Sequence, residues 1–177
     1  MYLRIMKKIA EDFLCVGTIE NIMNFNIPDS WVGRDIPRSP GGSPKDYLNS
    51  CVGCHAGMDS YRGAFATCDF NNDFLTTGPS IQGKMNNDQD VFPGGYLTTS
   101  QKWKHTGWLP IAQDKVGESF DGPQALMAMV ADSSELYSCL VKRSQEVLCP
   151  KAPQTEVMLQ QIAYKFQKNQ KLLDMIS

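Results

Sequence analysis

One pentapeptide, Cys51-Val52-Gly53-Cys54-His55, restricts the possible folds of this chain more than any other feature. C-x-x-C-H is the signature of covalent c-type haem attachment. The two thiols bond to the haem vinyl groups, and the adjacent imidazole becomes the proximal iron ligand. A fold of this kind must present all three side chains on one side of about one helical turn. The sequence therefore predicts one haem c, bound through Cys51, Cys54 and His55.

The alternatives for this motif are a disulfide loop or half of a zinc site. Structural zinc needs four ligands, so two further Cys or His residues at matching spacing would be required. The chain holds six cysteines but no second C-x-x-C. The histidine directly after Cys54 fits haem better than zinc. Because the motif occurs once, a mono-haem protein is expected.

Composition and charge exclude two classes of partner. The formal net charge is −2, so there is no polybasic surface to predict nucleic-acid binding. No apolar run approaches the roughly eighteen residues needed for a transmembrane segment.

The first residues are too interrupted by charge to be a signal-peptide core. Because bacterial haem c is attached outside the cytoplasmic membrane, we expect a periplasmic or extracytoplasmic protein whose numbering starts inside a longer precursor.

Four cysteines remain after the haem pair: Cys15, Cys68, Cys139 and Cys149. An even number in an oxidising compartment predicts two disulfides. Cys139 and Cys149 lie on one expected helix, about 15 Å apart along its axis. That exceeds the roughly 7 Å between Cα atoms that a disulfide can span. Each is therefore expected to pair with Cys15 or Cys68, the alternative being free buried thiols.

Hydrophobic periodicity and helix-capping residues predict an all-α fold. The expected helices are 2–15, one that opens at Ser43 and Pro44 and carries the haem motif, 123–131, 133–148 with Asp132 as its cap, and a last helix from Thr155 with a break near Asn169.

Residues 69–120 are rich in Gly and Pro and are predicted to be one long irregular loop around the haem. Its aromatic side chains, Trp103 and Trp108 among them, either cover the porphyrin or belong to an ordinary core. The resulting prediction is a cytochrome-c-like helical domain. Its three parts are an N-terminal helix with a Pro/Gly-rich extension (1–45), the haem domain (46–150) and a helical tail (151–177).

The sixth iron ligand is left open by the sequence. Electron-carrying cytochromes use Met or His at this position, and the favoured candidates are Met85 and His105. Met127, Met129 and a five-coordinate iron are the remaining possibilities. Met58 is only one turn beyond His55, so it is expected on the same side of the ring as the proximal ligand. Three arginines, Arg34, Arg38 and Arg62, flank the motif and either pair with haem propionates or face solvent.

The residues after the motif resemble those of a cytochrome-c-like domain family found in large secreted bacterial proteins. The haem motif is followed by Met58-Asp59, by Gly63-Ala64-Phe65-Ala66 and by Asp69-Phe70. The resemblance covers roughly residues 31–150. It implies a haem protein of the periplasm or cell exterior that transfers electrons.

The expected function is that of a c-type cytochrome domain that passes single electrons between redox partner proteins. No Ser-His-Asp or paired-carboxylate arrangement stands out, so an enzyme is not the favoured reading. Two alternatives remain: an open-site haem domain of peroxidase-like or gas-sensing type, and a subunit of a larger membrane or periplasmic redox complex.

Overall fold

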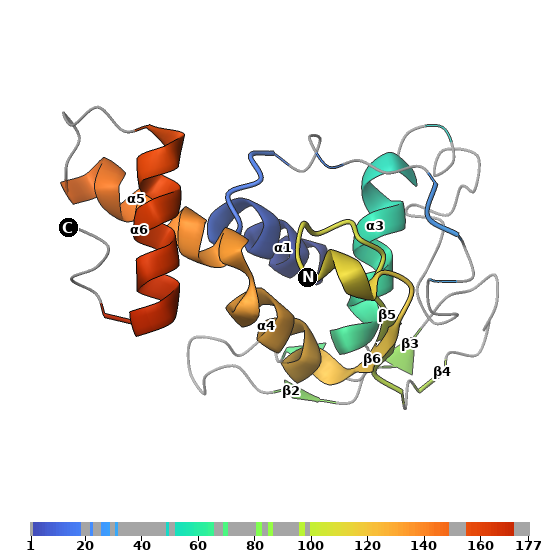
Figure 1. The fold of residues 1–177 in the computed structure, drawn as a ribbon. Helices are drawn as coiled ribbons and strands as arrows, with labels where there is room; N and C mark the ends of the chain where they lie inside the picture. Colours follow the sequence, from blue (N-terminus) through green and yellow to red (C-terminus); the bar gives the residue numbers. More distant parts are fainter. Residues whose placement is uncertain are drawn as a thin grey trace.

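The computed structural model describes residues 2–18, 22, 26–28, 31, 49, 52–65, 69–70, 81–82, 85–86, 96–97, 100–148 and 155–171. Its α-helices are α1 (Tyr2–Lys8), α3 (Val52–Arg62), α4 (Gly122–Asp132), α5 (Ser134–Leu148) and α6 (Glu156–Asn169). Shorter helical turns are the π-helical η1 (Ile9–Phe13) and the 3₁₀ turns η6 (Gly63–Phe65) and η7 (Gln113–Lys115). None of the described helices has the length and apolar character to span a bilayer. Figure 1 shows α5 and α6 together at one end of the molecule.

The prediction of an all-α fold is wrong, because short antiparallel strands occur within the segment expected to be one irregular loop. Among the described residues, the strand pairs are β1 (Asp69–Phe70) with β2 (Ile81–Gln82), β3 (Met85–Asn86) with β4 (Tyr96–Leu97), and β5 (Lys102–Lys104) with β6 (Ser119–Asp121). In the third pair Trp103 lies opposite Phe120, and their rings stack at 5.0 Å between centroids. Each strand has only two or three residues, too few for a period-two pattern to register in the sequence.

The β5–β6 pair continues beyond its last strand residue through the backbone of His105. Its N–H donates to the Glu118 carbonyl at 3.0 Å, and its carbonyl accepts from the Gly117 N–H at 2.8 Å. The chain between the two strands therefore returns in a closed loop. This loop carries Leu109 and Ile111 into the interior, where they are almost completely buried.

The main hydrophobic core lies between the N-terminal helix, α3, the β5–β6 pair and α4 (Figure 1). Its largest fully buried side chains include Met6 from α1, Tyr61 from α3, Leu109 and Leu126. Trp103 belongs to this core as well, and its Nε1 donates to the Gly122 carbonyl at 3.0 Å. The N-terminal helix thus shares one core with the segment that carries the haem motif. One face of α3 is fixed by this packing.

Close packing of α3 against the 105–111 loop depends on a glycine. A Cβ at Gly57 would overlap the Trp108 side chain, coming 2.7 Å from its Cβ and closer still to its ring. Trp108 is 3% exposed, so the ring has little room to move away. A side chain at position 57 would therefore push the helix off the loop.

Gly57→Ala is expected to lower the free energy of unfolding by about 2 kcal/mol, the usual cost of overpacking a tight core. Urea denaturation followed by far-UV circular dichroism measures the change. In a Trp108→Leu background, where the large ring is gone, the same substitution should cost much less. Equal costs in both backgrounds would show that the contact of Gly57 with Trp108 does not determine the spacing between α3 and the 105–111 loop.

The C-terminal helices agree closely with the sequence prediction. α4 has proline in its first turn, and α6 is capped by Thr155, whose hydroxyl accepts from the Met158 N–H at 3.3 Å. α6 ends at Asn169, followed by Gln170 in the left-handed region at φ +52°. Ser133, rather than the expected Asp132, caps α5, because its hydroxyl accepts from the Leu136 N–H at 3.3 Å.

A second, smaller core joins α5 to α6. Its buried residues are Val141 from α5 and four residues of α6: Leu159, Ile162, Ala163 and Phe166. The apolar positions of α6 recur at helical spacing, so one stripe of this helix faces α5.

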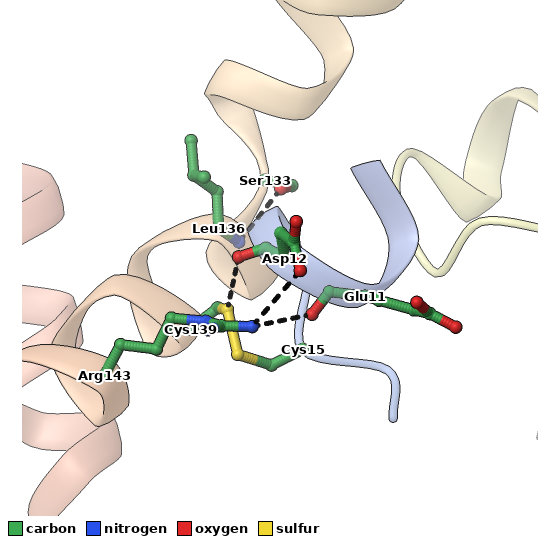
Figure 2. The surroundings of a disulfide bond; sticks show 7 residues. All are labelled: Glu11, Asp12, Cys15, Ser133, Leu136, Cys139 and Arg143. Atoms are coloured by element: carbon green, nitrogen blue, oxygen red, sulfur yellow. Dashed lines mark hydrogen bonds and ion pairs between the residues drawn. A yellow bond between two sulfur atoms is a disulfide. The ribbon is translucent and has the colours of Figure 1, made fainter. Parts of the chain in front are cut away.

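A disulfide joins the N-terminal segment to α5. The Cys15 and Cys139 sulfurs are 2.03 Å apart, which is one of the pairings that the sequence left open for Cys139. Figure 2 shows Arg143 beside this bond, with its guanidinium 3.0 Å from the Glu11 carbonyl. Cys68 and Cys149 lie outside the described residues, as does the expected helix start at Ser43.

Candidate haem-attachment site

The haem motif lies at the start of α3. The helix begins at Val52, so the backbone of Cys54 and all of His55 belong to its first turns. Cys51 directly precedes the helix and lies outside the described residues, as does the Cys54 side chain. From Val52 onward the backbone of the motif is α-helical, with 3.6 residues per turn.

His55 is held by a carboxylate one turn further along the helix. Its Nδ1 is 3.3 Å from Oδ2 of Asp59, and its side chain is 17% exposed. A carboxylate only accepts hydrogen bonds, so the proton of the neutral imidazole is on Nδ1. In this tautomer the lone pair is on Nε2, which is the nitrogen that binds iron when the other one is hydrogen-bonded to a carboxylate.

Asp59 also binds Arg62. The guanidinium Nη1 of Arg62 donates to Oδ1 of Asp59 at 3.4 Å, and the arginine side chain is 16% exposed. Asp59 is fully buried and accepts a hydrogen bond at each oxygen. Arg62 is thus engaged with a carboxylate rather than simply facing solvent, while Arg34 and Arg38 lie outside the described residues.

His105, the second histidine, is a fully buried residue beside α3. Its Nε2 is 2.9 Å from the Ile111 carbonyl, which can only accept, so Nε2 carries the proton. Its Nδ1, 2.6 Å from the Tyr61 hydroxyl, therefore accepts from that hydroxyl. Burial lowers the pKa of His105 and raises the pKa of Tyr61 to about 12, which keeps both groups neutral. Iron ligation by His105 would require one of these hydrogen bonds to break.

The methionine candidates lie in different parts of the fold. Met85 begins β3, and its side chain lies outside the described residues. Met129 is buried in the main core, whereas Met127 on α4 is 44% exposed. Met58 is buried on α3.

Two residues near the motif were not predicted to have a role of their own: Asp59 and Tyr61. The i, i+4 spacing of His55 and Asp59 is the sequence signal that could have indicated the first. No local signal joins Tyr61 to His105. Trp108 is buried, and its Nε1 has no hydrogen-bond acceptor among the residues that the structure describes.

No group of three or more Cys, His, Asp or Glu side chains arranged to hold a metal ion occurs in the described part of the chain. Searches against protein-family models, curated proteins and solved structures found no match to this chain.

Proposed function

We propose that this chain binds one haem c and carries single electrons between redox partner proteins. In this proposal Cys51 and Cys54 form the thioether bonds, and His55 is the proximal iron ligand. When bound, the haem supplies a one-electron ferric–ferrous couple. The observation that carries the proposal is the 3.3 Å contact between Nδ1 of His55 and the buried Asp59 carboxylate, which favours the tautomer with its lone pair on Nε2.

The residues around the motif fit this group because they make α3 a rigid platform. Gly57 packs against Trp108, and the Tyr61 hydroxyl bonds to His105. These contacts fix one face of the helix, while His55 is outside the buried core cluster. A metal-ligating histidine is normally oriented by a second hydrogen bond of the kind that Asp59 provides.

The sixth iron ligand in this proposal is Met85. His105 is the less favoured candidate, because both its ring nitrogens already make hydrogen bonds. The engagement of both His105 nitrogens also favours a second function, in which the sixth position is open and the haem binds a small gas or a peroxide. In either case the protein is proposed to act in the periplasm or outside the cell, alone or as a subunit of a redox complex.

The test of haem binding is expression in a host that matures c-type cytochromes. Wild-type protein should retain haem after denaturation and show the mass of one covalently attached haem. Cys51→Ser with Cys54→Ser should lose it, whereas Cys15→Ser with Cys139→Ser, which replaces the same number of cysteines outside the motif, should retain it. Wild-type protein without covalent haem would contradict the proposal.

Optical spectra of the oxidised and reduced protein then distinguish the two functions. A low-spin spectrum that does not respond to carbon monoxide is expected for electron transfer. A ferric methionine–iron charge-transfer band should be lost in Met85→Leu. A high-spin spectrum that shifts with carbon monoxide would favour the open-site function instead.

A further inference from the structure

The buried carboxylate of Asp59 lies on α3 and bonds to two side chains of the same helix. His55 lies four residues before it and Arg62 three residues after it, at 3.3 and 3.4 Å. Removing a carboxylate from water is costly unless it is paired and hydrogen-bonded. Asp59 is fully buried, and one of the two partners found for it among the described residues is the histidine assigned to iron.

An exposed i, i+4 pair of this kind would have little influence on its histidine. Water and salt screen such charges, and the pair contributes only a few tenths of a kcal/mol. The Asp59 side chain is 0% exposed and that of His55 is 17% exposed, so solvent screens their interaction much less. The carboxylate therefore acts on the imidazole at short range.

We propose that Asp59 is a positioning residue that sets the electron donation of His55 to iron and so lowers the reduction potential of the haem. This inference rests on the proposed function. A carboxylate that accepts the Nδ1–H makes the imidazole a more basic ligand. A more basic ligand stabilises ferric over ferrous iron. Arg62 shares the carboxylate, so it draws charge from Asp59 and moderates the effect.

Asp59→Asn is the direct test, because it keeps the shape of the side chain and removes its charge. The ferric–ferrous equilibrium is expected to shift about tenfold toward ferrous, which is about 59 mV for one electron. Arg62→Gln should move the equilibrium in the opposite direction, since the carboxylate then acts on His55 alone. Potentiometric titration of the holoprotein measures both shifts.

Two further measurements separate action through His55 from a general change of charge or fold. The NMR resonance of the His55 ring N–H in the ferric protein should move in Asp59→Asn and return toward its wild-type position in Asp59→Glu. Asp132→Asn removes an exposed carboxylate of α4 and should move neither the resonance nor the potential.

Covalent haem with an unchanged potential and N–H resonance in Asp59→Asn would overturn the inference and leave the proposed function standing. Shifts of the same sign in Asp59→Asn and Arg62→Gln would also overturn it. Wild-type protein without covalent haem would instead be the failure of the proposed function. If Asp59→Asn does not fold, Arg62→Gln alone still tests the expected sign.

Discussion

Replacing both Cys15 and Cys139 by serine is expected to lower the free energy of unfolding by about 4 kcal/mol. The bridge closes a loop with a sequence separation of 124 residues. A link of that span removes many conformations from the unfolded chain, and its effect grows with the logarithm of loop length. Cys139 is also almost completely buried, so serine at this position adds a desolvation cost.

Denaturant titration of the oxidised wild type and the double-serine variant measures this effect. Arg143→Gln is the matched control, because it removes another link between α5 and the N-terminal segment. Its guanidinium is half exposed and lies 3.8 Å from an Asp12 carboxylate oxygen, so a loss of less than about 1 kcal/mol is expected. Equal denaturation midpoints for the wild type and the double-serine variant would show that the bridge does not stabilise the fold.

The helices of the C-terminal third were predictable because their signals are local. Proline near the start of α4, the Thr155 cap and the apolar stripe of α6 all lie within the helices that they specify. The β5–β6 pair was not predictable, because Trp103 pairs with Phe120 across an intervening loop. Periodicity over three residues carries no information about such a partner.

The candidate site was likewise predictable only in part. The C-x-x-C-H motif could be recognised because its residues are adjacent in sequence. The contact of Asp59 with His55, four residues earlier, follows once α3 is known to be a helix. His105 could not be assigned in this manner. A histidine that ligates iron and one that bonds to Tyr61 and Ile111 look identical in sequence, and only the fold brings these groups together.

His105→Leu is expected to lower the free energy of unfolding by about 3 kcal/mol. Leucine fills a similar volume but leaves the Tyr61 hydroxyl without its acceptor at 2.6 Å and takes a donor from the Ile111 carbonyl. The Gln113 side chain, 3.4 Å from the same carbonyl, offsets only part of this loss. Urea denaturation at neutral pH measures the effect. A loss below about 0.5 kcal/mol, the range of ordinary surface substitutions, would show that these bonds do not stabilise the core.

A double-mutant cycle with Tyr61→Phe tests whether the two side chains act as a pair. Each single variant leaves the remaining member of the Tyr61–His105 hydrogen bond unsatisfied, so the double variant should cost at least about 1 kcal/mol less than the sum of the two single variants. Additive costs would contradict the pairing.

The pH dependence of the same protein gives an independent test of the state of His105. Burial lowers its pKa from 6.5 in the folded state, so the unfolded chain binds more protons once the pH falls below 6.5. Wild-type stability should therefore fall with pH in that range and level off below the lowered pKa. His105→Leu lacks this term, so its deficit relative to wild type should shrink as the solution is acidified. A constant deficit would mean that His105 has the same pKa in the folded and unfolded states. That result would contradict its burial between Tyr61 and Ile111.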